Sequence, residues 1–165
     1  MLSVEIGVEC EEWRRACPEA AVLARAAAEA AFKASDEKAK LPPSQRIVIG
    51  VTLADDTEQR RLNRIWRGKD ASTNVLAFPV AGSEAPPSGA PLLLGDVVLA
   101  LETIAAEAAA QNKPLADHLR HLVVHGVLHL LGHDHQEPTE ADAMERHETA
   151  ILVELGVPDP YRDII

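Results

Sequence analysis

Histidines are concentrated near the end of this sequence, in a pattern that suits metal binding. Of seven histidines, six fall between positions 118 and 135, a density that chance does not explain. His125 and His129 are four residues apart in a segment expected to be helical, so their imidazoles point the same way, about 6 Å apart along the axis. Gly132 then lets the chain reverse, so that His135 can return to the same place. The spacing predicts a metal site at the end of this helix, made of His125, His129 and His135.

Three imidazoles with one open coordination position are the usual arrangement of a catalytic zinc ion. The same ligands also suit other divalent metals such as nickel, cobalt and copper. Zinc proteases of the His-Glu-x-x-His type carry a glutamate after their first histidine as the general base, whereas this sequence has Gly126 there. The metal-binding pattern is therefore present and the protease base is missing.

The neighbours of these three histidines have less certain roles. His118 and His121 precede His125 by seven and four residues. Each of them is either a partner of a metal ligand or an ordinary residue of the helix surface, and the second interpretation is favoured. His133 is expected to be exposed or to line the site. Asp134 is equally suited to orienting a ligand and to capping the turn, and His147 is expected to face solvent.

A second group of residues suits phosphate binding. Between positions 60 and 69 the chain has five cations and no acid, namely Arg60, Arg61, Arg64, Arg67 and Lys69. Three of these arginines share one face of a predicted helix, and arginine binds phosphate through two parallel hydrogen bonds. Trp66, in the same segment, is able to stack on a nucleobase. The alternative is a solvated helix face with a tryptophan in the core.

The charge balance restricts where nucleic acid can bind. The chain has 16 lysines and arginines against 26 acids, a net charge of −10, which on its own disfavours RNA, DNA and lipid surfaces as partners. Without the five clustered cations, the rest of the chain has 11 cations and 26 acids, a net charge of −15. We therefore expect a local phosphate-binding strip on an acidic body that binds free RNA weakly and depends on a partner such as the ribosome.

The length of 165 residues favours one domain, and the 47% of hydrophobic residues indicate a globular chain. Periodicity and turn residues predict strands over 2–9, 46–53, 73–78 and 92–101, helices over 19–33, 57–66, 102–112, 114–131 and 139–155, and loops over 38–45 and 81–91. This alternation indicates an α/β or α+β fold with one sheet covered by helices. With no membrane-spanning run, no secretory signal and two cysteines expected to be reduced, we expect a cytoplasmic protein.

Five stretches of this sequence resemble the YbeY family, the metal-dependent endoribonucleases of bacterial rRNA maturation. They are Leu62–Asp70, Thr73–Pro79, Leu94–Val98, His121–His135 and Leu155–Tyr161. The resemblance implies one α+β domain over residues 1–165, with a mixed sheet and packed helices. It also implies a zinc ion on His125, His129 and His135 and a functionally important Arg67. One departure is His133, where many members carry tyrosine.

The activity that the resemblance implies is zinc-dependent, single-strand-specific cleavage of RNA during maturation of the 3′ end of small-subunit rRNA and in ribosome quality control. The implied partners are single-stranded RNA, rRNA and the ribosome or its small-subunit proteins, and no membrane. Two alternatives remain open, a zinc metalloprotease-like hydrolase and a non-enzymatic, metal-binding ribosome-assembly factor. The residue that accepts the proton is not evident from the sequence.

Overall fold

Four apolar segments of the chain pair into one sheet. The computed structural model describes residues 1–41, 46–80, 90–133 and 138–161. Strands β1 (Leu2–Val8), β2 (Ile47–Ala54) and β4 (Leu92–Ala100) run parallel to one another, and β3 (Val75–Pro79) runs antiparallel to β4. Their order is β1-β2-β4-β3, so β3 forms an edge. The predicted α+β fold with a mixed sheet is confirmed.

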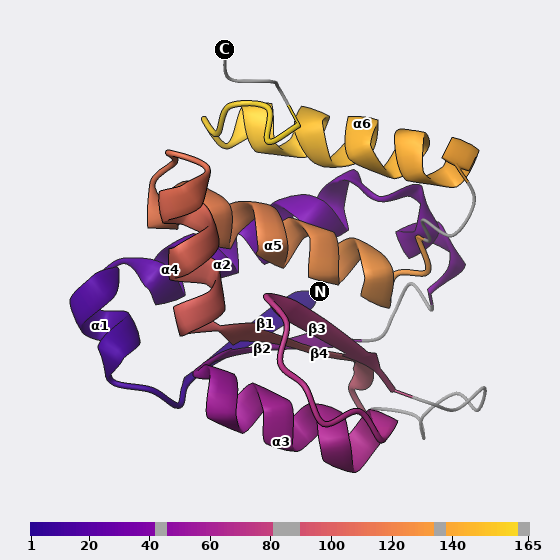
Figure 1. Cartoon of the computed structure of the whole chain (residues 1–165). Helices are drawn as coiled ribbons and strands as arrows, with labels where there is room; N and C mark the ends of the chain where they lie inside the picture. The colour runs from indigo at the N-terminus through magenta and orange to yellow at the C-terminus, as the bar shows by residue number, and fades with distance from the viewer. Residues whose placement is uncertain (42–45, 81–89, 134–137, 162–165) are drawn as a thin grey trace.

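Helices cover both faces of this sheet (Figure 1). They are α1 (Glu12–Ala16), α2 (Ala20–Ala34), α3 (Asp56–Arg67), α4 (Leu101–Ala110), α5 (Leu115–Leu130) and α6 (Pro138–Glu154). Helix α3 lies on one face, α2 and α5 lie on the other, and α6 packs over α5 and α2. None of the helices in the described ranges has the length and apolar character needed to cross a membrane.

The four strands and five helices predicted from the sequence are present, with ends within two residues of those expected. Two short elements were not predicted: α1, and a 3-10 helix (Asp36–Lys40) that begins before the expected loop 38–45. Most of the loop predicted over 81–91 lies outside the described residues.

Small side chains hold α5 close to its neighbours. Helix α2 buries an alanine stripe, Ala20, Ala24, Ala27, Ala28 and Ala31, in the core it shares with α5. On the sheet side, a Cβ atom added to Gly126 of α5 would lie 2.7 Å from Cγ1 of Val97, closer than side chains pack. Helix α5 is therefore fixed between α2 and the sheet, and this close packing sets the positions of its histidines.

Helix α3 has well-defined ends. The Asp55 side chain accepts a hydrogen bond from the backbone N–H of Glu58 at 2.7 Å, which caps the start of the helix. Gly68 ends it with a φ of +71°, a left-handed conformation that glycine adopts without strain. The cation cluster is thus carried by a helix of defined length that ends beside the sheet edge.

Candidate functional site

Helix α5 presents His125 and His129 toward each other, one turn apart. Their Nε2 atoms are 3.1 Å apart, and their ring centroids are 4.6 Å apart. Two nitrogens bound to one tetrahedral zinc ion at about 2.0–2.1 Å lie about 3.3 Å from each other. The pair therefore fits one metal ion without rearrangement.

The third predicted ligand, His135, lies outside the described residues, as does Asp134. Within the described ranges, no three or more His, Cys, Asp or Glu side chains gather around one point in the way a metal ion requires. The complete ligand set of His125, His129 and His135 therefore stays a prediction, supported by the geometry of its first two members.

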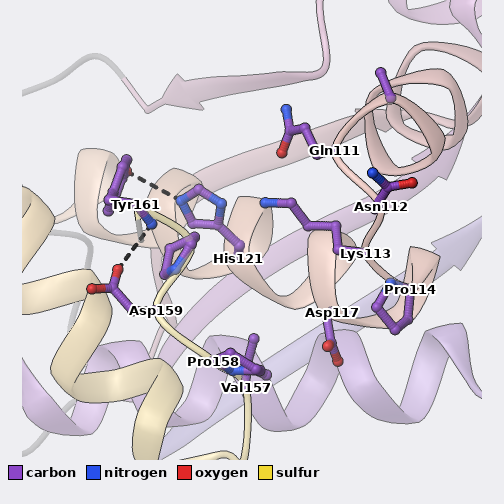
Figure 2. Close-up of a pocket in the computed structure, with 12 residues that line it drawn as sticks. Gln111, Asn112, Lys113, Pro114, Asp117, His121, Val157, Pro158, Asp159 and Tyr161 are labelled. Atoms are coloured by element: carbon purple, nitrogen blue, oxygen red, sulfur yellow. Dashed lines mark hydrogen bonds between the residues drawn. The ribbon is translucent and has the colours of Figure 1, made fainter. Parts of the chain in front are cut away.

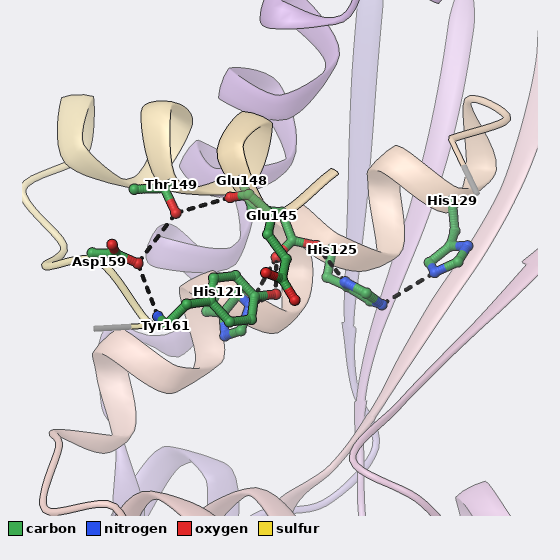
Figure 3. Close-up of polar contacts among 8 residues, drawn as sticks. All are labelled: His121, His125, His129, Glu145, Glu148, Thr149, Asp159 and Tyr161. Carbon is green, nitrogen blue, oxygen red and sulfur yellow. Dashed lines mark hydrogen bonds and ion pairs between the residues drawn. The ribbon is translucent and has the colours of Figure 1, made fainter. Parts of the chain in front are cut away.

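A buried carboxylate on α6 holds His125 in place (Figure 3). Glu148 is 0% exposed. Its Oε1 accepts a hydrogen bond from Nδ1 of His125, and its Oε2 accepts one from Nε2 of His121 at 3.0 Å and another from the Tyr161 hydroxyl. Metal-binding histidines usually donate their second ring N–H to a carboxylate, which fixes the tautomer and directs the other nitrogen to the metal. Glu148 makes this contact with His125, so the other ring nitrogen of His125, Nε2, is the one that faces His129.

The same hydrogen bonds keep Glu148 ionised in the protein interior. Burial raises the pKa of this carboxyl, but the hydrogen bonds from His121, His125 and Tyr161 outweigh burial and lower its pKa to about 2. Burial and the neighbouring Glu148 carboxylate raise the pKa of Tyr161, so its hydroxyl stays protonated and remains a donor. The network therefore places a fixed negative charge behind His125.

A cleft of about 740 Å³ joins the histidine pair to the end of the cation cluster. Its walls include His125 and His129 from α5, and Arg67 and Lys69 from the end of α3 and the segment that follows it. Arg67 donates a hydrogen bond through Nη2 to the carbonyl oxygen of Ala77 in β3. Its guanidinium carbon also lies 5.1 Å from the centroid of the Phe78 ring. The two groups predicted from the sequence therefore meet in one cleft along β3.

The rest of the cation cluster is less basic than the sequence indicated. Arg60 is bound through two nitrogens to the Asp70 carboxylate, at 2.8 and 3.0 Å. Arg61 is bound in the same way to Glu58, at 2.9 and 2.6 Å. Trp66 is 71% exposed, so the interpretation of a core tryptophan was wrong, and it lines a different hollow from the histidines. Two cations of the cluster, Arg67 and Lys69, therefore line the histidine cleft, while Arg60 and Arg61 are paired with acids.

Two buried polar residues of α3 fix the segment that forms one cleft wall. The side-chain amide of Gln59 donates to the carbonyl of Val98 at 2.9 Å and accepts from the backbone N–H of Thr73 at 2.8 Å. Asn63 donates to the carbonyl of Ala71 at 2.8 Å. The sequence did not single out either residue, although each is an amide on the inner face of a helix.

The remaining described histidines are more buried than expected. His118 is 3% exposed and lies 2.8 Å from a Glu107 carboxylate oxygen, so the surface interpretation was wrong. Burial lowers the pKa of His118, Glu107 opposes this effect, and Lys113 and His121 add to it. For His121 the surface interpretation was also wrong, because its ring belongs to the Glu148 network.

His133 and His147 lie together beside the end of α2. The Nε2 atom of His133 is 2.9 Å from the Ser35 hydroxyl, and its ring centroid is 5.2 Å from that of His147. His147 is half-buried, with Nε2 3.3 Å from the carbonyl oxygen of Ala34, so it does not simply face solvent. His133 does not line the cleft described above.

A family model described as Endoribonuclease YbeY matches residues 9–156 of this chain. The chain belongs to the YbeY family. Two curated relatives named Endoribonuclease YbeY are each 48% identical to this chain. The one from Paramagnetospirillum magneticum aligns over 97% of this chain and 96% of its own length. The one from Parvibaculum lavamentivorans aligns over 97% of this chain and 85% of its own length. A third, from Azorhizobium caulinodans, is 46% identical over 97% of this chain and 96% of its own length. The resemblance read from the sequence is confirmed.

The fold of this YbeY-family chain matches a solved structure as well. The solution structure of a Thermotoga maritima protein aligns with 99% of this chain and 100% of its own, with a TM-score of 0.53 at 20% sequence identity. At that identity the likeness shows a shared fold. Membership in a family of endoribonucleases identifies the chain as a nuclease, a hydrolase that acts on RNA.

The protease alternative has no support in this YbeY-type site. The position that carries the general base in zinc proteases is Gly126 here, and an added Cβ would lie 2.7 Å from Val97 and 3.4 Å from Val75. A glutamate therefore cannot replace this glycine without moving α5 away from the sheet. The family comparison favours the ribonuclease interpretation over the metalloprotease-like one.

Proposed function

We propose that this chain is a zinc-dependent, single-strand-specific endoribonuclease that acts in the maturation of the 3′ end of small-subunit rRNA. The observation that carries the proposal is the cleft in which His125 and His129, with Nε2 atoms 3.1 Å apart, are joined by Arg67 and Lys69. Metal-binding and phosphate-binding side chains in one cleft are what hydrolysis of a phosphodiester requires.

Each side chain has a defined task in this proposal. A zinc ion on His125, His129 and His135 would supply Lewis-acid chemistry and favour deprotonation of water near neutral pH. Glu148 holds the His125 ring in the tautomer that directs Nε2 into the cleft. Arg67, anchored on the Ala77 carbonyl, binds a non-bridging phosphate oxygen and neutralises the charge that grows on it in the transition state.

The charge distribution supports single-stranded RNA as the substrate and the ribosome as the setting. Outside the segment 60–69, the chain has 11 cations and 26 acids, so a duplex lying across the surface would meet repulsion beyond the cleft. A single strand needs to contact only the cleft itself. The weak binding of free RNA expected from this charge would suit an enzyme that receives its substrate within a small-subunit particle, where rRNA and ribosomal proteins supply further contacts.

The test is a comparison of zinc content and RNA cleavage among purified variants. We expect wild type to carry one zinc ion and to cut a single-stranded RNA but not the same RNA in a duplex. His129→Ala should lose zinc and cleavage together, whereas Arg67→Ala should keep zinc and lose most of its cleavage. Lys33→Gln, which removes an exposed cation of α2 that does not line the cleft, serves as the control. Full activity in both cleft variants would contradict the site assignment.

The assembly-factor alternative predicts a different outcome of the same experiment. A non-enzymatic protein would bind zinc and associate with small-subunit particles but would cut no RNA in wild-type form. In cells, restoring the trimmed 3′ end of small-subunit rRNA with wild type but not with Arg67→Ala would support processing, because Arg67→Ala keeps its metal.

A further inference from the structure

A second cavity lies behind the proposed catalytic cleft. It has a volume of about 510 Å³ and is lined by the end of α4, the start of α5 and the segment after α6 (Figure 2). His121 and Tyr161 line both this cavity and the cleft. Their rings pack edge to face, with centroids 5.4 Å apart. The two hollows therefore adjoin, with these two side chains between them, and His121 lies one helical turn from His125.

Lys113 is directed along this second cavity. Figure 2 shows its side chain extended beside α5, with the ammonium group pointing toward the His121 ring. No hydrogen bond or ion pair of this ammonium with any described residue is present, although Asp117 and Glu107 act on it at longer range. Burial lowers the pKa of Lys113. A partly desolvated cation without a close counter-ion is suited to an anion that arrives at the boundary between the two cavities.

Both acids that line the cavity are already engaged. The Asp117 carboxylate accepts a hydrogen bond from Arg120 at 2.7 Å. The Asp159 carboxylate accepts one from the backbone N–H of Tyr161 at 2.8 Å and one from Thr149 at 3.2 Å. These contacts offset part of the negative charge that would repel a phosphate.

The lining of the cavity combines apolar groups with side-chain amides. Its apolar lining includes Val157, Pro158 and the Tyr161 ring. The amides of Gln111 and Asn112 line the cavity as well. Unpaired bases in RNA are bound in this way, by packing of the flat face on apolar or aromatic groups and hydrogen bonding at the polar edge.

We propose that this second cavity binds one nucleotide of the single-stranded RNA substrate, next to the nucleotide held in the cleft, with the phosphate between the two bound by Lys113. The inference rests on the proposed ribonuclease function and adds a substrate-binding position to it. It implies that the enzyme contacts its strand on one side of the cut through the second cavity.

The experiment uses two cavity variants, each with a matched control. Lys113→Gln removes the cation and is compared with Lys33→Gln, whose lysine lines neither hollow. Ala110→Trp fills the cavity from α4 and is compared with Ala109→Trp, which adds the same ring outside it. The substrates are single-stranded oligoribonucleotides that share one cleavage site and are extended by one nucleotide at a time at either end.

We expect kcat/KM of wild type to rise several-fold when one particular end becomes long enough to enter the second cavity. Lys113→Gln and Ala110→Trp should lose this gain through a higher KM, with kcat and the cleavage of shorter substrates unchanged. Fluorescence anisotropy with the zinc chelated provides a readout that is independent of cleavage. There, Lys113→Gln should reduce the slope of log Kd against log salt by about 0.7, the value for one lost phosphate contact on a single strand.

The inference is overturned if both variants match their controls on every length, or if they lower kcat/KM equally for short and long substrates. These outcomes differ from a failure of the proposed function, in which wild type would cut no RNA. In that case the anisotropy measurement still decides, because an unchanged salt slope in Lys113→Gln would exclude a phosphate contact at this lysine.

Discussion

Replacing Glu148 with glutamine should weaken zinc binding while leaving the fold in place. Glu148→Gln keeps the size of a side chain that is 0% exposed, so it creates no cavity. It changes the hydrogen bonding, because His125, His121 and Tyr161 all donate to the carboxylate, and an amide has only one oxygen to accept them. One donor must then face the amide NH₂, unless a ring moves its proton from one nitrogen to the other.

Both consequences work against metal binding. An unmatched buried donor costs about 1–3 kcal/mol. If His125 instead accepts from the amide, its proton moves to Nε2 and removes the lone pair that would bind zinc. Substitution of groups that orient metal-binding histidines typically weakens metal affinity by about 10–100-fold, which corresponds to about 1.4–2.8 kcal/mol. We expect the zinc Kd of Glu148→Gln to rise within this range.

The assay is competition for zinc with a chromophoric chelator at neutral pH, with urea unfolding of the metal-free protein to detect any change in stability. Glu154→Gln, the same substitution at an exposed position of α6, provides the control and should bind zinc as wild type does. A zinc Kd for Glu148→Gln within twofold of wild type would refute the reasoning, because it would mean that Glu148 does not orient a metal ligand.

Three further predictions test other parts of the structure. Gly126→Ala should lower the free energy of unfolding in urea by about 1–3 kcal/mol through overpacking against the sheet, and an unchanged value would show that α5 and the sheet are not in close contact. Arg67→Lys keeps the charge but loses the forked donors, so kcat for RNA cleavage should fall by about tenfold or more with zinc content unchanged; wild-type kcat would argue against a transition-state contact. Since burial lowers the pKa of His118, the unfolded chain takes up the proton first below about pH 6.5. The metal-free protein should therefore lose stability from pH 7 to pH 5, and His118→Gln should lose less, as measured by urea unfolding at each pH.

The strands and longer helices were predictable because each carries a periodic pattern over many residues. Helix α1 and the 3-10 helix have five residues each, too few for a period to show. Trp66 was harder to place because α3 buries the amides Gln59 and Asn63 instead of apolar side chains. The usual rule, that the apolar face of a helix points inward, therefore gave no guide to which face of α3 meets the sheet.

The same difference holds for the candidate site: a relation within one helix could be predicted from the sequence, whereas a contact between distant segments could not. His125 and His129 were predictable because a spacing of four residues determines their relative direction within one helix. Glu148 contacts His125 across 23 residues of sequence and lies on another helix, so no local pattern joins them. One signal for Glu148 was present, since it lies four residues after Met144 and four before Leu152, both buried, and an acid in such an apolar stripe needs a partner.

The cleft exists because strand β3 forms an edge of the sheet. Side chains on opposite faces of a sheet are normally separated by the sheet itself, yet Arg67 comes from α3 on one face and His129 from α5 on the other. They share a cavity because β3 is a five-residue strand with nothing paired beyond it in the described residues. Unpaired edges invite additional strands. A strand added to β3, from a peptide or from a second copy of the chain, would stand between Arg67 and the histidines and close the cleft that they share.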